Sequence, residues 1–473
     1  MNGLRKILIA GAVLLANGVT GGWCAMAQGL DGVWTGKLEL GGGRSLKLVL
    51  HVSEADNSVL MDSPEQSAYG LTGENVSLRN DSLSFEIPNL RMSYSGTRKE
   101  NLITGTFRQN GFSLPLSFEP GEVKPERPQT PQPPFPYTQE EVRIENKAAN
   151  ATLAGTLICP ENCTTSTPVV VLVTGSGLQN RDEEVFEHKP FAVIADYLAR
   201  NGIASLRYDD RGYGESTGEV LTATTADFAQ DAQAVVEWLR RQGRFGKVGI
   251  IGHSEGGQIA YMLGAAGETD RTDGTTGATN ASPGAPDYII SIAGPSVKGT
   301  KTIAYQNRTA LQRSGTPEKY LDDMQKAVEQ VFEYKLKNPD ITSISDEVMT
   351  GLYPGWDEDM VTRQFTAMLR QSVMEKPSND WMVWFLNYDP AEDMRRLKIP
   401  ALIIYGEKDT QVPPSLNSEP ARRALPAAQI KTYPGLNHLM QHATTGYSDE
   451  YATIPETISP EVLADIRNFI LAR

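Results

Sequence analysis

Four short runs of consecutive apolar residues constrain the fold of this 473-residue chain more than any other feature. Apolar runs of this length are typical of strands that are buried on both faces of a parallel sheet. The segments between them include stretches with the spacing of amphipathic helices, such as residues 191–200 and 225–241. This alternation predicts an α/β sheet with helices on both sides. The four runs are residues 169–173, 248–251, 288–292 and 401–405.

The residues that precede this region follow a period of two. Apolar and polar side chains alternate in segments such as 46–52, 83–87 and 112–118, and no stretch between residues 30 and 118 has helical spacing. Several short strands without a helix predict a small all-β domain over residues 28–119, either a barrel or a sandwich. Two domains also agree with the length of the chain, which exceeds the usual size of one domain.

A proline-rich stretch, residues 120–138, separates the two regions. A segment of this composition is expected to be extended and semi-rigid, so we place the domain boundary here and assign residues 139–473 to the second domain. Its prolines are Pro120, Pro125, Pro128, Pro131, Pro133, Pro134 and Pro136.

A long insertion, about residues 297–387, interrupts the α/β pattern between two of the apolar runs. Its apolar residues recur at helical spacing, as Leu321, Met324 and Val328 do. We expect a helical lid over the candidate site; the alternative is that these helices only extend the core. Its tryptophans, Trp356, Trp381 and Trp384, are expected to pack against neighbours rather than to contact a ligand.

The first residues are typical of a cleaved export signal. Arg5 and Lys6 precede an apolar run over residues 7–16, and Ala25 and Ala27 provide the small residues that a signal peptidase recognises. The sequence therefore predicts a signal peptide over residues 1–27 and a secreted or periplasmic protein. A membrane anchor is the rival interpretation, but a span needs roughly 20 apolar residues. We expect no membrane insertion after cleavage.

The formal net charge of −14 at pH 7 excludes partners more readily than it identifies them. An acidic surface repels nucleic acid and anionic membranes, so we expect no nucleic-acid partner. The oligomeric state is not encoded in any pattern that we recognise.

One segment carries the strongest chemical signal, because the buried run 248–251 leads into Gly252-His253-Ser254-Glu255-Gly256 and then into a predicted helix. Gly-x-Ser-x-Gly on such a strand-to-helix turn exposes the serine hydroxyl, and the glycines allow the backbone to pass closely. Ser254 is therefore the candidate nucleophile, and the backbone N–H of Glu255 is a candidate donor to an oxyanion. The alternative is a glycine-rich turn with a structural serine.

Residues 139–473 resemble the α/β-hydrolase superfamily, and in particular the secreted bacterial esterases that are grouped with serine aminopeptidase-like hydrolases. The resemblance implies an α/β-hydrolase sheet and a catalytic serine, acid and histidine in that order along the chain. It does not cover residues 28–138. Besides the Ser254 turn, it is carried by residues 173–177, 207–212, 405–409 and 435–438.

The family places its catalytic imidazole after the last strand, near the C-terminus, which points to His438. His442 is the nearest rival, but it lacks the Gly-Leu-Asn sequence that leads to His438. Asp409, which follows the run 401–405, is the candidate acid that would orient His438. Asp389 and Glu407 are the alternatives; Asp389 precedes a proline and is better suited to cap a helix.

The resemblance also assigns the second oxyanion donor to the backbone N–H of Ser176, in the loop after the run 169–173. The sequence departs here from the family's common His-Gly pattern, because Thr174 precedes Gly175.

Cys159 and Cys163 are the cysteines that remain after the signal peptide is removed. In an oxidising compartment they form a candidate disulfide, and two unpaired thiols are the alternative. Two cysteines without nearby histidines are too few for a metal site, so we expect neither a metal nor an organic cofactor.

These observations predict a serine hydrolase that cleaves a small-molecule or glycan-linked carboxylic ester through an acyl-enzyme on Ser254. A peptidase or aminopeptidase on the same residues is the first alternative, and an acidic pair that binds a substrate amine would favour it. A non-catalytic binding protein is the second alternative. The role of the all-β domain cannot be inferred from the sequence.

Overall fold

The computed structural model describes residues 29–41, 44–63, 66, 68–79, 81–121, 127–266, 283–374 and 380–473. The predicted signal peptide, residues 1–27, lies outside the described residues, and so do residues 122–126 of the proline-rich stretch. Among the described residues, no helix has both the length and the apolar character that a membrane crossing requires.

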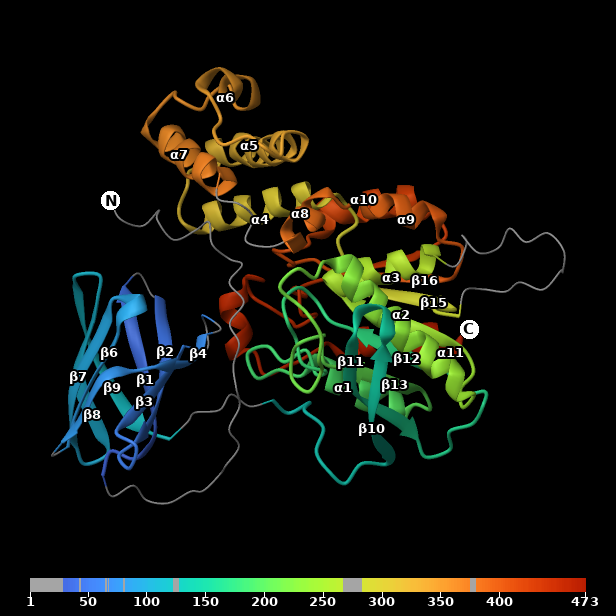
Figure 1. The fold of residues 1–473 in the computed structure, drawn as a ribbon, viewed down its shortest axis with the longest axis horizontal. Helices are drawn as coiled ribbons and strands as arrows, with labels where there is room; N and C mark the ends of the chain where they lie inside the picture. Colours follow the sequence, from blue (N-terminus) through green and yellow to red (C-terminus); the bar gives the residue numbers. More distant parts are fainter. Residues whose placement is uncertain are drawn as a thin grey trace.

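The N-terminal domain is an antiparallel sheet in the order β4-β3-β2-β1-β9-β8-β7-β6-β5. Its two outermost strands, β4 and β5, follow one another in the chain with only Gly73 between them, so the sheet closes into a small barrel (Figure 1). This confirms the predicted all-β domain. The strands are β1 (Gly32–Gly41), β2 (Arg44–Ser53), β3 (Ser58–Ser63), β4 (Ala68–Thr72), β5 (Glu74–Arg79), β6 (Ser82–Ile87), β7 (Met92–Lys99), β8 (Leu102–Gln109) and β9 (Phe112–Pro120).

Aromatic side chains fill the interior of the barrel. Tyr94 and Phe118 pack edge to face with ring centroids 5.1 Å apart, and both are almost completely buried. The polar groups of the buried aromatic side chains have hydrogen-bond partners. The Tyr94 hydroxyl donates to the Leu116 carbonyl at 3.1 Å, and the Trp34 indole N–H donates to the Leu30 carbonyl at 2.8 Å. The barrel thus has a hydrophobic core of its own.

The second domain is built on an eight-stranded sheet in the order β10-β11-β13-β12-β14-β15-β16-β17. Strand β11 is antiparallel to both of its neighbours, β10 and β13. The strands from β13 through β12 to β17 are parallel to one another. The four apolar runs of the sequence are the adjacent strands β12, β14, β15 and β16. The bounds are β10 (Tyr137–Asn146), β11 (Ala151–Pro160), β12 (Val169–Val173), β13 (Ala204–Tyr208), β14 (Val248–His253), β15 (Tyr288–Ile292), β16 (Ala401–Gly406) and β17 (Gln429–Tyr433).

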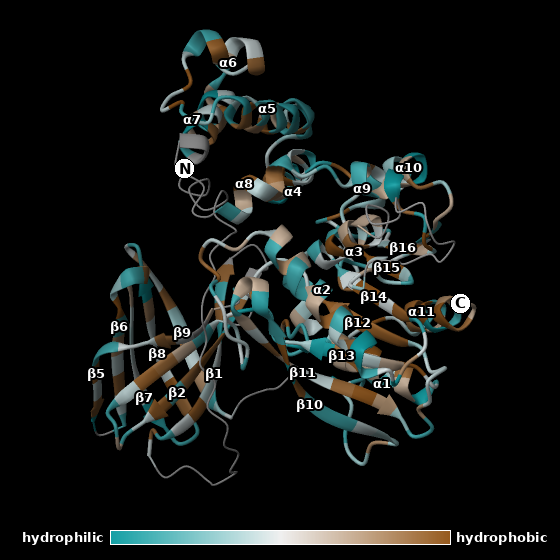
Figure 2. Ribbon diagram, turned by 45° about the vertical axis from the view of Figure 1, so that its right-hand side comes forward, coloured by the Kyte–Doolittle hydropathy of each residue, from teal (hydrophilic) through white to brown (hydrophobic). Residues whose placement is uncertain are grey.

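Helices cover both faces of this sheet, as the continuous apolar runs predict. Along β12, Val169, Val171 and Val173 face the core under α2, α3, α9 and α10, whereas Val170 and Leu172 face the core under α1 and α11. Figure 2 shows these central strands as a hydrophobic layer between helices. The helices are α1 (Pro190–Arg200), α2 (Thr225–Gln242), α3 (Glu255–Ala266), α9 (Pro390–Arg396), α10 (Pro414–Ala424) and α11 (Pro460–Leu471).

The predicted helical insertion lies between β15 and β16. Its helices have a small core of their own, which includes Leu321, Met324 and Phe365. In Figures 1 and 2, α4 and α8 lie next to the sheet domain and α5, α6 and α7 lie farther out. The bounds are α4 (Gly299–Arg313), α5 (Glu318–Lys337), α6 (Asp346–Leu352), α7 (Met360–Met374) and α8 (Asp380–Asn387).

The described part of the proline-rich stretch is bound to the second domain rather than free of it. The Arg127 guanidinium donates to the carbonyls of Phe186 and Ala452, both at 2.8 Å. The Gln129 side chain donates to the Ile458 carbonyl at 2.8 Å and accepts from the N–H of Thr457. Polar side chains between the prolines therefore fix this segment, a contact that proline content alone does not reveal.

Cys159, at the end of β11, and Cys163 are free thiols in the structure, so the disulfide remains a prediction. Burial and the neighbouring Cys163 raise the pKa of the Cys159 thiol to about 11.

The sheet core should dominate the stability of the second domain. We expect Leu172→Ala to lower the free energy of unfolding by about 2–5 kcal/mol, because it leaves a cavity in a strand that is buried on both faces. The matched control is Leu221→Ala, since Leu221 is 79% exposed. Urea unfolding followed by circular dichroism measures both; equal stabilities of the two variants would contradict the assignment of the core.

Candidate active site

Ser254 lies on a tight turn between a buried strand and a helix. Strand β14 ends at His253, α3 begins at Glu255, and Ser254 between them has a φ of 52°. A positive φ is unfavourable for a residue with a side chain, so the surrounding structure has to hold it. The Ser254 N–H donates to the Ile292 carbonyl at 2.8 Å, which ties the turn to the end of β15.

Two glycines make this turn feasible. A Cβ atom on Gly252 would lie 2.0 Å from the carbonyl oxygen of Gly256. A Cβ atom on Gly256 would lie 2.1 Å from the carbonyl oxygen of Val173, at the end of β12. Both distances are far below van der Waals contact, so no other residue fits either position without a shift of the backbone.

The structure brings the candidate acid and the candidate base together. Asp409 follows β16 and His438 follows β17, and Asp409 Oδ2 lies 2.8 Å from His438 Nδ1. The other oxygen, Oδ1, accepts from the N–H groups of Gln411 and Val412, both at 2.8 Å. Both side chains are buried. This arrangement fixes the imidazole and leaves its Nε2 as the nitrogen that can accept a proton.

The rival residues have other roles. Asp389 caps α9 and accepts from the Ala391 N–H at 3.1 Å, as its position before a proline suggests. Glu407 accepts from the Gly435 N–H at 2.9 Å. His442 lies 2.9 Å from Glu456 with 59% of its side chain exposed. None of these contacts involves His438.

Asn437 shapes the loop that carries His438. Its side-chain oxygen accepts from the N–H groups of Leu439 at 3.0 Å and Gln441 at 2.9 Å, and its amide donates to the Gln441 side chain at 2.9 Å. The side chain is completely buried. An amide can bond in both directions at once, which explains why asparagine suits this position.

His253 links the nucleophile turn to the His438 loop. Its Nε2 lies 3.0 Å from the His438 carbonyl oxygen, and the two rings are 4.9 Å apart at their centroids. His253 therefore positions the backbone of the candidate base.

Glu183 is a site residue that sequence reasoning missed. Its Oε1 lies 2.9 Å from His253 Nδ1 and accepts from the Gly175 N–H at 2.7 Å. It therefore joins the residue before Ser254 to the loop after β12, and that loop is close, because a Cβ atom on Gly175 would lie 3.1 Å from the Ser254 Cβ. Glu183 stands in a charged segment, Arg181-Asp182-Glu183-Glu184, where nothing in the sequence separates a buried carboxylate from an exposed one.

The electrostatics of this pair favour a protonated His253. Burial alone lowers the pKa of His253, but the Glu183 carboxylate and the hydrogen bonds outweigh it, so its pKa is raised above the usual value. A ring that faces a carbonyl oxygen on one side and a carboxylate on the other is best satisfied when both nitrogens carry a proton.

The two candidate oxyanion donors also lie together. Because the Gly175 N–H is already bound to Glu183, the next N–H along the loop, that of Ser176, is the better candidate. The loop that carries Ser176 is adjacent to Glu255, because Thr174, Gly175 and Gly177 line the same small cavity as the Glu255 side chain. The Ser176 side chain also lowers the pKa of the Glu255 carboxyl, in opposition to the effect of burial.

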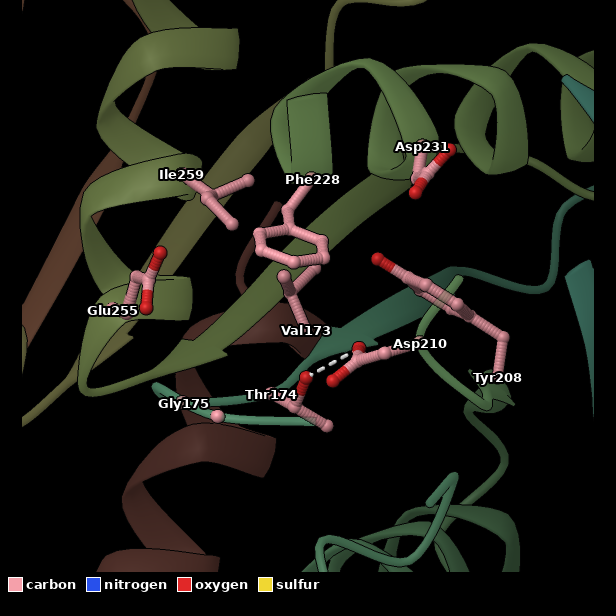
Figure 3. Close-up of a pocket in the computed structure, with 10 residues that line it drawn as sticks. Val173, Thr174, Gly175, Tyr208, Asp210, Phe228, Asp231, Glu255 and Ile259 are labelled. Atoms are coloured by element: carbon pink, nitrogen blue, oxygen red, sulfur yellow. Dashed lines mark hydrogen bonds between the residues drawn. The ribbon is translucent and has the colours of Figure 1, made fainter. Parts of the chain in front are cut away.

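A small cavity lies behind this loop (Figure 3). Its volume of about 10 Å³ has room for roughly one water molecule and none for a substrate. Thr174 donates to Asp210 at 2.8 Å on one side of it, and the Glu255 side chain lies on the other. Within the described residues, no group of three or more His, Cys, Asp or Glu side chains is placed to hold a metal ion.

The fold and the site together define an α/β hydrolase. The sheet has the mixed order given above, the serine follows β14, and the acid and the histidine follow β16 and β17 in that sequence. The profile of the X-Pro dipeptidyl-peptidase (S15) family matches residues 150–418, more than half of the chain, and the chain belongs to this family. His438 lies beyond the matched residues.

The chain is also similar to curated esterases. It is 26% identical to the bifunctional esterase/perhydrolase DCH of Acinetobacter calcoaceticus over 279 residues, which cover 58% of this chain and 84% of that protein. It is 26% identical to esterase EstD of Thermotoga maritima over 276 residues, 58% of this chain and 54% of EstD. The alignment thus spans about half of EstD.

Solved structures with a similar course of the chain include an esterase from Pyrococcus furiosus. The comparison has a TM-score of 0.42 and 15% sequence identity, and it covers 74% of this chain and 99% of the esterase chain. A proline iminopeptidase from Mycobacterium smegmatis has a TM-score of 0.41 and 15% identity over 70% of this chain and 98% of that one.

The raised pKa of His253 makes part of the stability depend on pH. A histidine whose pKa is higher in the folded state stabilises the fold fully below the unfolded pKa of about 6.5, and this stabilisation is lost as the pH rises through the folded pKa. We expect the stability advantage of the wild type over His253→Asn to be constant below the unfolded pKa and to fall as the pH rises above about 6.5.

His188 provides a control of opposite sign. Burial lowers its pKa to about 4, so it is neutral in the fold at neutral pH. The advantage of the wild type over His188→Asn should therefore rise between about pH 4 and pH 6.5 and stay constant above that range. Thermal unfolding of the three proteins measures both trends. Two trends of the same sign would contradict the protonation states assigned here.

Proposed function

We propose that this hydrolase cleaves carboxylic esters through an acyl-enzyme on Ser254. The observation that carries the proposal is the buried Asp409–His438 contact of 2.8 Å, in a loop that His253 ties to the Ser254 turn. A serine hydroxyl needs such a base, because it is a weak nucleophile on its own.

The reaction proceeds in two halves. The Ser254 oxygen attacks the carbonyl carbon while His438 Nε2 takes its proton, and Asp409 stabilises the imidazolium that forms. The N–H groups of Glu255 and Ser176 hold the developing oxyanion. The C–O bond of the ester then breaks, the alcohol leaves with the proton from His438, and a water molecule hydrolyses the acyl-enzyme by the same route.

Buried acids favour an ester over a substrate with a free amine. An aminopeptidase needs an accessible carboxylate to hold the ammonium group, but Glu183, Asp210 and Glu255 are all buried. The hydrogen bonds of Glu183 and Asp210 go to backbone and side chains of the protein itself. The two curated relatives named above are esterases, which supports the same choice.

A peptidase is the second candidate, because the family to which the chain belongs is described as X-Pro dipeptidyl-peptidase. The same nucleophile, base and oxyanion donors serve both reactions, so the substrate pocket decides between them.

We also propose that the protein is exported to the periplasm or the medium. Its proposed substrate is a small-molecule or glycan-linked ester.

We expect Ser254→Ala to lower kcat on p-nitrophenyl acyl esters by about 10⁴-fold or more, because the acyl-enzyme can no longer form. The wild type, but not this variant, should be labelled by a fluorophosphonate probe. A screen that adds aminoacyl and X-Pro p-nitroanilides decides between ester and peptide substrates. An unlabelled wild type would instead indicate the non-catalytic binding protein.

The two C-terminal histidines allow a matched comparison. His438→Ala should lose at least about 10³-fold in kcat, because the general base is removed. His442→Ala changes an exposed side chain only four residues away and should retain wild-type kcat. Equal losses in the two variants would contradict the assignment of the base.

A further inference from the structure

The Glu255 carboxylate collects hydrogen bonds from three separate parts of the second domain. Its Oε1 accepts from the Thr225 hydroxyl at 2.6 Å, at the start of α2, and from the Trp381 indole N–H at 2.8 Å, on α8 of the insertion. The loop after β12 lies beside it, because Thr174, Gly175 and Gly177 line the same small cavity as Glu255. One buried acid thus bonds to both α2 and the insertion and is adjacent to the oxyanion loop.

The position of this carboxylate is specific to the site. Glu255 is the first residue of α3 and follows the nucleophile, and its own N–H is one candidate oxyanion donor. Ser176 supplies the other. The side chain that contacts the insertion therefore also lies beside the loop that carries the second oxyanion donor. The catalytic cycle written above uses only the backbone of Glu255 and leaves the carboxylate without a role.

Burial makes each of these contacts costly to lose. Burial raises the pKa of Glu255, and the bonds from Thr225, Trp381 and Ser176 oppose this by stabilising the charged form. A buried carboxylate that loses a donor either keeps an unsatisfied charge or moves toward other donors. Both responses would disturb the first turn of α3 and the Ser176 contact.

Trp381 is more than a packing residue. Its ring stacks on Phe385, with centroids 5.2 Å apart and an interplanar angle of 18°, while its N–H is directed to Glu255. The sequence predicts packing for the tryptophans of the insertion, and the stacked ring agrees with that. The polar contact is the additional feature, because it connects α8 to the residue next to the nucleophile.

We propose that Glu255 is a positioning residue that couples helix α8 of the insertion to the oxyanion hole. When α8 is seated, the Trp381 N–H fixes the carboxylate, and the carboxylate fixes Ser176 and the start of α3. When α8 moves away, the carboxylate loses a donor and the two oxyanion N–H groups lose their common support. This inference rests on the proposed function, and it makes the insertion a regulator of the chemical step.

The test compares two tryptophans of the same helix. Trp381→Phe keeps an aromatic ring on Phe385 and removes only the donor, so we expect kcat to fall about tenfold with KM within about twofold, as for an interaction that acts in the transition state. Trp384 stacks on Tyr388, with centroids 4.7 Å apart, and Trp384→Phe should change neither constant. Thermal unfolding verifies that both variants are folded.

A double-mutant cycle separates coupling from packing. Glu255→Leu removes the acceptor, so the addition of Trp381→Phe to it should cause no further loss of kcat if Trp381 acts through Glu255. Glu255→Gln keeps an oxygen acceptor and should retain most of the activity. If Glu255→Leu does not fold, Thr225→Val is measured on its own: it removes another donor to the same oxygen and should lower kcat with little change in KM, as Trp381→Phe does.

The outcomes distinguish this inference from the proposed function. A wild type that is neither labelled at Ser254 nor active on esters or p-nitroanilides would overturn the proposed function itself. A labelled, active wild type with equal kcat for Trp381→Phe and Trp384→Phe would overturn the coupling alone. Independent, multiplicative losses in the Glu255→Leu cycle would do the same.

Discussion

The start of α3 and the end of β12 approach each other so closely that a Cβ atom between their backbones would clash. Gly256 faces the Val173 carbonyl, and Gly252 faces Gly256 across the turn. This approach holds Ser254 in its left-handed conformation and sets the Glu255 N–H beside the loop that carries Ser176. The same turn also fixes the loop after β17, since His253 binds the backbone of His438. The site is thus organised around close glycine packing.

Three buried carboxylates then arrange the loops around the turn. Asp409 holds the imidazole of His438, Glu183 joins the glycine loop to His253, and Glu255 joins α2 to the insertion. Each is expensive to bury, and each accepts hydrogen bonds from residues distant in the sequence. These acids have different partners and therefore different roles. Asp409 serves catalysis through His438, whereas Glu183 and Glu255 hold the loops and helices around the nucleophile in place.

The family membership and the site geometry both indicate a hydrolase, but the family description and the curated relatives point to different substrates. The S15 description names peptides, whereas DCH and EstD are esterases. Nucleophile, base and oxyanion donors are common to both reactions, so specificity has to come from the surfaces that contact the acyl and leaving groups. In this chain the insertion between β15 and β16 lies next to the site, and its contact through Trp381 reaches the residue beside the nucleophile.

The sequence by itself determined the architecture and the candidate nucleophile, because both are encoded in local patterns. Continuous apolar runs specify strands buried on two faces, and Gly-x-Ser-x-Gly after such a run specifies the turn at Ser254. The pairing of Asp409 with His438 was expected from the resemblance to α/β hydrolases, in which the acid and the histidine follow the serine in that order. Only the tertiary structure decided which charged residues are buried, since that depends on residues far apart in the chain. Glu183, in a run of four charged residues, and Trp381, 126 positions from Glu255, therefore carried no local signal of their role.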